Sequence, residues 1–111
     1  MTDFEVRTST EPGRVVVALT GECDLSAREE LTSALLAAVG MAPVVVVDVA
    51  GLRFLDSTGV HGLVTAHHAA QRDGGRLYLI NAAGTVASVL EVTGLDDLLR
   101  PPSDGTDRPR G

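Results

Sequence analysis

A short polar motif, Asp56-Ser57-Thr58-Gly59, lies between a run of strand-forming residues and a run with helical periodicity. The motif therefore marks the N-terminus of a predicted helix, with hydroxyl groups in its first turn. The first N–H groups of a helix have no partner within the helix, and the helix dipole adds partial positive charge, so an anion is stabilised there. A phosphate on Ser57 would add roughly two negative charges beside Asp56. A protein that is switched by phosphorylation of this serine would need no active site of its own.

The same motif also fits a purely structural role. Aspartate is a good N-cap residue because its carboxylate accepts hydrogen bonds from first-turn amides. Small residues after Asp56 would let the helix approach the sheet. From these residues alone, both interpretations stay open.

Three histidines follow on the same predicted helix. His61 and His68 share a helix face, but the seven residues between them correspond to about 10.5 Å of rise, which is more than helical zinc motifs use. We therefore expect no metal site, and we expect His67 or His61 to lie partly at the interface with the sheet. The single cysteine, Cys23, excludes an internal disulfide and is expected to be a small buried hydrophobe.

The N-terminal half of the chain predicts a hairpin followed by a helix. Residues 4–8 and 15–19 are predicted strands, joined by a turn in which proline and then Gly13 fit the two central positions. Ser26 and Glu29 have the spacing of a capping box. Leucine and alanine then recur at helical spacing, which predicts a helix over 27–39 that ends at Gly40.

The remaining elements alternate between strand and helix. Residues 44–49 are almost continuously valine, which predicts a central strand covered on both faces, and 50–55 are expected to form a crossing loop. A helix from Ser57 is expected to end at 73–75. A short strand over 76–80 and a third helix that ends at Gly94 follow. Asp48, alone among apolar neighbours, is expected to accept hydrogen bonds from loop amides.

These elements predict an α/β fold, a mixed sheet that opens with an antiparallel hairpin and is covered by about three helices. At 111 residues the chain has the length of one domain. Residues 1–100 are expected to form it. Residues 101–111, rich in Pro, Gly, Asp and Arg, are expected to be a disordered tail.

Charge and hydropathy exclude several classes of partner. The formal net charge is −6 and the basic residues form no cluster, which argues against direct binding to nucleic acid or anionic lipid. No segment approaches the roughly 20 apolar residues that a membrane span needs. The first seven residues lack the apolar run of a secretory signal. We therefore expect a cytoplasmic protein without a cofactor.

Nearly the whole chain, from about Phe4 to Leu99, resembles the STAS domains of bacterial anti-sigma-factor antagonists. Three motifs carry the resemblance: Leu-Thr-Gly-Glu-Cys-Asp at 19–24, the path from Val-Asp-Val at 47–49 into Asp-Ser-Thr-Gly at 56–59, and Thr-Gly-Leu at 93–95. The resemblance implies that Ser57 is the phosphoacceptor. It places Asp24 beside that serine, with Asp56, Thr58, Gly59 and His61 around the phosphosite or on the partner-binding surface.

In this family the implied function is a partner switch. The unphosphorylated protein would bind an anti-sigma factor that is also a serine kinase, phosphorylation of Ser57 would end the complex, and a serine phosphatase would restore it. Two departures from the pattern are visible. His61 replaces a small residue, which bears on which anti-sigma factor is recognised. The fold is expected to be shortened at its C-terminus, where the last helix of the family is expected to be missing.

Two alternatives belong to other functional classes. A STAS subunit could regulate a lipid or anion transporter through a partner protein, in which case Ser57 and Thr58 only cap a helix. An enzyme is disfavoured, because the sequence has no glycine-rich phosphate loop, no nucleophile elbow and no set of metal ligands.

Overall fold

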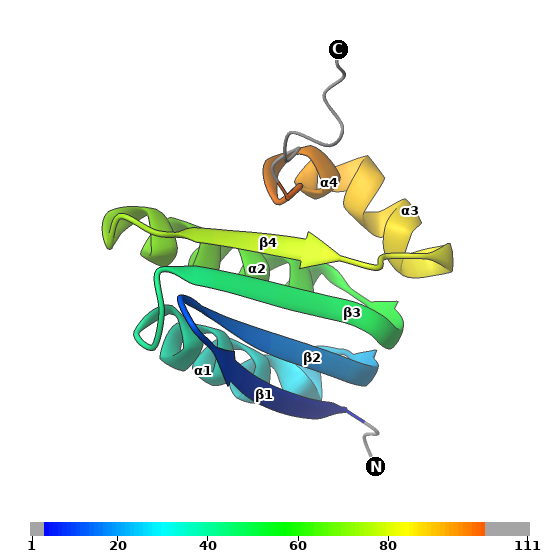
Figure 1. Ribbon diagram of the computed structural model, residues 1–111. Helices are drawn as coiled ribbons and strands as arrows, with labels where there is room; N and C mark the ends of the chain where they lie inside the picture. The colour runs from blue at the N-terminus through cyan, green and yellow to red at the C-terminus, as the bar shows by residue number, and fades with distance from the viewer. Residues whose placement is uncertain (1–3, 102–111) are drawn as a thin grey trace.

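The first two strands pair as an antiparallel hairpin, and the rest of the chain alternates between helices and strands (Figure 1). The computed structural model describes residues 4–101. Its elements are β1 (Glu5–Glu11), β2 (Arg14–Cys23), the 3-10 helix η1 (Leu25–Ala27), α1 (Arg28–Val39), β3 (Val44–Leu55), α2 (Ser57–Arg72), β4 (Arg76–Ile80), α3 (Gly84–Thr93) and α4 (Leu95–Leu98).

The hairpin turn forms as the sequence predicts. Glu11 pairs with Arg14 in the ladder, and Gly13 has a φ of 80°, a conformation that glycine adopts without steric cost. The Arg14 guanidinium donates to the Glu11 carboxylate at 2.6 Å. Both side chains are exposed, so this ion pair contributes little to stability.

The predicted capping box at Ser26 does not form. Asp24 lies two residues before Ser26 and accepts hydrogen bonds from both its backbone N–H, at 3.1 Å, and its hydroxyl, at 2.6 Å. The Ser26 hydroxyl is therefore used as a donor to Asp24. Asp24 caps η1, and α1 begins one turn later at Arg28 after an N-cap, Ala27, that makes no side-chain hydrogen bond. Gly40 ends α1 in a right-handed conformation, with a φ of −78°.

Strand β3 is longer than expected. It pairs in parallel with β2 on one side and β4 on the other, and it continues to Leu55, so the predicted crossing loop over 50–55 is wrong. The reason lies in β2, which also extends beyond its predicted end: its last residues, up to Cys23, pair with the last residues of β3. Two register shifts, between Ala18 and Thr20 and between Gly21 and Glu22, break the simple alternation that marks a strand in a sequence.

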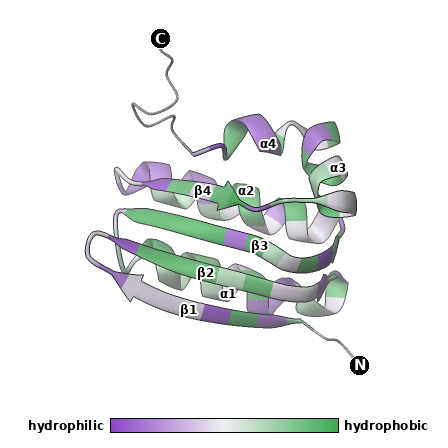
Figure 2. Ribbon diagram, turned by 45° about the vertical axis from the view of Figure 1, so that its right-hand side comes forward, coloured by the Kyte–Doolittle hydropathy of each residue, from purple (hydrophilic) through white to green (hydrophobic). Residues whose placement is uncertain are grey.

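Helices α1 and α2 cover one face of the sheet (Figure 1). Hydrophobic residues concentrate in the two middle strands (Figure 2). The core includes Leu19, Leu31, Val47 and Leu63, all fully buried, and burial of a side chain of this size contributes about 1.5–3 kcal/mol. A Cβ on Gly62 of α2 would lie 3.2 Å from the Leu31 side chain of α1, so this glycine lets the two helices approach closely.

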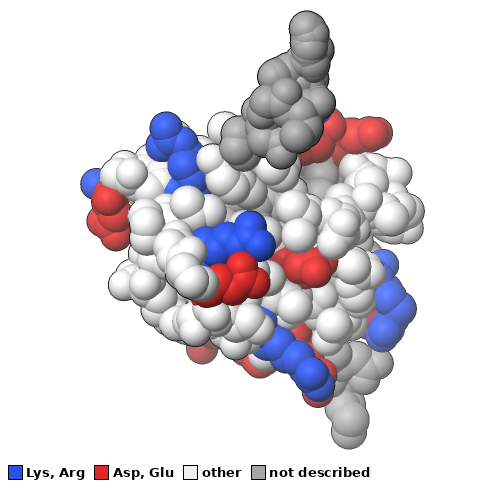
Figure 3. Space-filling model, in the orientation of Figure 1, with Lys and Arg blue, Asp and Glu red and all other residues white. Residues whose placement is uncertain are grey.

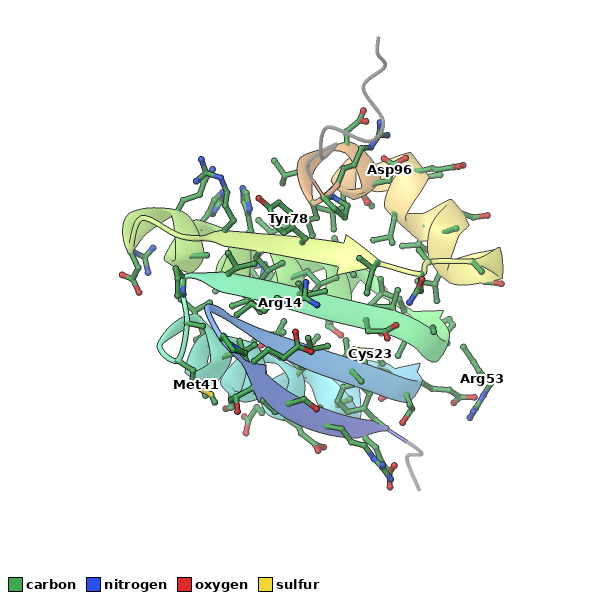
Figure 4. All side chains as sticks on the ribbon, in the orientation of Figure 1. Arg14, Cys23, Met41, Arg53, Tyr78 and Asp96 are labelled. Carbon is green, nitrogen blue, oxygen red and sulfur yellow. The ribbon has the colours of Figure 1, made fainter. Side chains whose placement is uncertain are left out.

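The opposite face of the sheet carries a shallow hollow of about 440 Å³, lined mainly by apolar side chains of β2, β3 and β4, with Glu11 and Arg14 as its charged members. Val45, Val46 and Val47 are nonetheless all buried, as the unbroken valine run predicts. Arg14 and Tyr78 lie on this face (Figure 4). Basic side chains on the visible face are scattered, and several of them lie beside acidic ones (Figure 3).

The C-terminal elements agree with the predicted strand over 76–80 and with a helix ended by Gly94, whose φ is 82°. Helices α3 and α4 lie beside the β4 edge (Figures 1 and 2). The last helix was expected to be missing, but the structure contains the four-residue helix α4, and Leu99 after it is bound through its carbonyl oxygen to the Leu79 amide at 2.8 Å. The predicted tail lies, apart from Pro101, outside the described residues. Between residues 4 and 101 no helix is long and apolar enough to cross a bilayer.

Candidate functional site

The site is built at the point where β3 ends and α2 begins. Asp56 has an extended backbone and caps α2: one oxygen of its carboxylate accepts from the Thr58 amide at 3.0 Å and from the Gly59 amide at 3.2 Å. This confirms the N-cap interaction expected from the sequence. Because Asp56 satisfies two first-turn amides, the helix begins at a fixed position, and Ser57 is its first residue.

Ser57 is exposed and lines a hollow of about 270 Å³ together with Arg28, Thr58 and His61. Within residues 4–101 its hydroxyl makes no hydrogen bond. The Ser57 oxygen is therefore accessible to a reactant that approaches from solvent. The four side chains come from the first turn of α1 and the first two turns of α2, so the hollow lies where the two helices begin.

The Thr58 hydroxyl, unlike that of Ser57, is engaged. It donates to the Asp56 carboxylate at 2.6 Å, and the Thr58 side chain is half-buried. The hydroxyl is therefore engaged in the cap. Of the two adjacent alcohols, Ser57 is the accessible one.

Gly59 and Cys23 are in close contact beneath the first turn of α2, and we call this contact the floor of the site. A Cβ on Gly59 would clash with the Leu55 side chain and lie 2.9 Å from the Cys23 sulfur, so only glycine lets the first turn of α2 rest on the ends of β2 and β3. The Asp56 amide also donates to the Cys23 carbonyl at 3.2 Å. Cys23 is fully buried near the end of β2 (Figure 4), as expected for a small hydrophobe.

The electrostatics of this floor disfavour a thiolate. Burial, followed by the charges of Asp56 and Asp24, raises the pKa of the Cys23 thiol to about 11. Asp24 thus lies close enough to act on the same thiol as Asp56, and both carboxylates lie near the floor of the site. A hydrogen bond from the Ser26 hydroxyl is the main cause that lowers the pKa of Asp24, which is therefore ionised at neutral pH.

The histidines separate into buried and exposed ones. His61 and His68 are exposed, whereas His67 is 8% exposed and packs in the interior. Burial, followed by the charge of His68, lowers the pKa of His67. Of the residues expected at the interface with the sheet, His67 is the one that is buried. In the described part of the chain, no three His, Cys, Asp or Glu side chains are grouped so that they could hold a metal ion.

Asp48 has the structural role expected of it. Its carboxylate accepts from the Ala50 amide at 3.0 Å and from the Asn81 side chain at 3.1 Å. The second bond fixes Asn81, which follows β4 and has a positive φ of 68°. Asp48 thereby ties β3 to the loop after β4.

Comparison with known proteins adds the identity of the fold. A family model described as "Mlab, STAS domain" matches residues 6–101. The chain belongs to the STAS domain family. Its mixed four-stranded sheet with an opening hairpin is the STAS fold, as the sequence motifs predicted. A comparison with curated proteins finds no significant match to this STAS domain.

Several solved structures resemble this STAS domain along most of its length. An anti-sigma factor antagonist from Mycobacterium paratuberculosis is similar with a TM-score of 0.79 and 24% identity, over 93% of this chain and 90% of that one. The anti-sigma factor antagonist SpoIIAA in its unphosphorylated form is similar with a TM-score of 0.74 and 24% identity, over 94% of this chain and 90% of that one. The Bacillus cell fate determinant SpoIIAA in its phosphorylated form is similar with a TM-score of 0.68 and 25% identity, over 96% of this chain and 99% of that one.

Sequence reasoning singled out most of this site but missed two parts of it. Asp56, Ser57 and Thr58 are neighbours in the chain, so their arrangement follows from local helix capping. Arg28 was not singled out, because it lay inside the predicted capping box and nothing in the local pattern connects it to Ser57. Cys23 was expected to be buried, but its place under Gly59 depends on the pairing of β2 with β3.

Proposed function

We propose that this STAS domain is an anti-sigma-factor antagonist controlled by phosphorylation of Ser57. With a free Ser57 hydroxyl it binds an anti-sigma factor that has serine kinase activity, and after phosphorylation it releases that partner. The observation that carries the proposal is the exposed, unengaged Ser57 hydroxyl at the start of α2, beside a threonine whose hydroxyl is engaged. Likeness to SpoIIAA, solved in both unphosphorylated and phosphorylated forms, supports it. Because sigma factors act in the cytoplasm, the proposal includes a cytoplasmic location for this protein.

The chemistry belongs to the partners. In the kinase, the Ser57 oxygen attacks the γ-phosphorus of ATP, the new O–P bond forms as the bond to the β-phosphate oxygen breaks, and ADP leaves. The hydroxyl proton passes to a base of the kinase. A serine phosphatase directs water to the phosphorus, which returns the alcohol and releases inorganic phosphate. The STAS domain supplies the acceptor and its position.

The effect on binding follows from charge. A phosphate adds about two negative charges next to the Asp56 carboxylate, and they would have to lose water beneath a bound partner. A loss of about 3 kcal/mol corresponds to roughly a hundredfold in affinity, enough to move a partner between two complexes. Folding is affected much less, because the N-terminus of α2 favours an anion.

Mass spectrometry of the protein incubated with its cognate kinase and ATP tests the proposal. Wild type should gain one phosphate, Ser57→Ala none, and the matched variant Thr58→Val one, because the Thr58 hydroxyl is engaged in the cap. In binding assays Ser57→Ala should keep the kinase and Ser57→Asp should lose it. Equal labelling of Ser57→Ala and wild type, or equal binding of the two Ser57 variants, would remove the proposal.

A second candidate is the transporter-linked function, and the matching family model, described as "Mlab, STAS domain", does not name an antagonist. In this alternative the domain regulates a lipid or anion transporter through protein contacts, and Ser57 is only part of the helix start. Affinity purification separates the two: recovery of a transporter ATPase subunit favours the alternative, whereas recovery of an ATPase-fold serine kinase favours the antagonist.

A further inference from the structure

Two basic side chains share the hollow with Ser57. Arg28, the first residue of α1, and His61, in the second turn of α2, line it together with Ser57 and Thr58. Arg28 is exposed, and it has no ion-pair partner among residues 4–101. A cationic side chain without a partner is thus available next to the accessible alcohol.

The position of Arg28 is not explained by the stability of α1. The N-terminus of a helix carries partial positive charge, so a cation there is unfavourable, whereas acids such as Glu29 and Glu30 in the same turn are favourable. A neutral residue at position 28 would suit the helix better. The observation that accounts for an arginine is the hollow that it shares with Ser57.

We propose that Arg28 and His61 bind the phosphoryl group of phosphorylated Ser57, an inference that rests on the proposed function. The guanidinium presents a planar set of N–H donors that matches phosphate oxygens, and imidazole can donate an N–H from the other side. Phosphoserine carries two negative charges at neutral pH, so each contact is charge-assisted. The partial positive charge at the N-terminus of α2 adds to this attraction.

Other charged groups near the hollow oppose or moderate the contact. Asp56, directly before Ser57, repels the phosphate, although its carboxylate is held in the cap. Glu29 lines an adjoining hollow of about 440 Å³ between α1 and α2, together with Arg28, Thr32, Ser33, His61 and Thr65. Arg28 and His61 border both hollows. A phosphate bound by them lies at the mouth of the groove between the helices, so phosphorylation changes that groove and not only the serine.

A ³¹P NMR titration tests the proposal on the full chain with phosphoserine placed at position 57 by genetic-code expansion. The second ionisation of phosphoserine has a pKa of about 6, and a cation in contact lowers it. Arg28→Gln should therefore raise the titration midpoint by about half a pH unit or more. Arg28→Lys should restore part of the shift, because it keeps the charge but not the planar fork, and His61→Ala should raise the midpoint by less than Arg28→Gln.

Arg7→Gln is the matched control, because it removes the same charge from an exposed position on β1. It should leave the midpoint unchanged. If Arg28→Gln and Arg7→Gln titrate alike while circular dichroism reports both as folded, the proposed contact is wrong. No kinase takes part in this measurement, so its outcome is separate from the labelling and binding assays that decide the proposed function.

Discussion

The backbone N–H of Asp56 donates a hydrogen bond to the carbonyl oxygen of Cys23, with 3.2 Å between nitrogen and oxygen. The bond joins the residue before Ser57 to the end of β2. The Asp56 carboxylate meanwhile holds the first turn of α2. One residue thus fixes the start of α2 both to the sheet and to the helix itself, and Ser57 is presented from a rigid support.

Loss of this support is the first prediction. Asp56→Ala removes the N-cap acceptor and should lower the free energy of unfolding by about 1 kcal/mol, measured by urea denaturation. Asp73→Ala serves as the control, because Asp73 is an exposed acid at the C-terminal end of the same helix, where the dipole does not favour negative charge. Equal losses in the two variants would contradict the capping role of Asp56.

The close approach under α2 gives a second prediction. Gly59→Ala places a methyl group against the Leu55 side chain and the Cys23 sulfur, and should destabilise the fold by about 1–3 kcal/mol. At Gly40 the added methyl would meet only the Ala37 carbonyl, at 3.6 Å, and φ is −78°, so Gly40→Ala should be neutral or stabilise by about 0.4–1 kcal/mol. Thermal unfolding of both variants compares them directly, and a stable Gly59→Ala protein would show that α2 can move away from the sheet.

A third prediction concerns the thiol. Because the pKa of Cys23 is raised to about 11 and the side chain is fully buried, very little reactive thiolate exists at neutral pH. Iodoacetamide at about pH 7.5 should label the native protein far more slowly than the urea-unfolded protein. Cys23 is the only cysteine in the chain, so intact mass reports this site alone. Equal labelling rates in the two states would mean that the floor of the site opens readily.

The fourth prediction is a pH dependence of stability that arises from His67. The folded state lowers the pKa of this histidine below its ordinary value of 6.5, so the unfolded chain takes up a proton at a higher pH than the folded protein does. The free energy of unfolding should therefore fall as the pH drops through 6.5, and the loss should stop only below the folded-state pKa. His67→Leu should remove this part of the dependence.

The stability of His67→Leu at about pH 8 gives a second check on the role of this histidine. Within the described residues the His67 Nδ1 is buried without a hydrogen-bond partner, so leucine should cost little stability there. His61→Gln, at an exposed position, is the control and should keep the wild-type pH dependence. If His67→Leu and His61→Gln respond to pH in the same way, His67 is not the cause.

Local chemistry explains where sequence reasoning agreed with the structure. Gly13 and Gly94 both have positive φ values, at positions where a turn and a helix end were predicted. The strand over 76–80 and the helix that begins at Ser57 have the predicted starts. Each of these features depends on residues a few positions apart. The capping residue was predicted to be Ser26, although Asp24 lies only two positions before it. In the structure Asp24 is the capping residue, and it accepts a hydrogen bond from the Ser26 hydroxyl.

Taken alone, the sequence determined the order of strands and helices, the hairpin, the family, and an acid followed by two alcohols at the start of α2. Tertiary structure alone decided how far β3 runs, because its last residues are strand only through their pairing with the end of β2 across two register shifts. It also decided which alcohol is accessible and that Arg28 lines the hollow beside Ser57. The physical reason is that capping and turns are set by neighbouring residues, whereas these contacts join residues far apart in the chain, brought together by burial of the core.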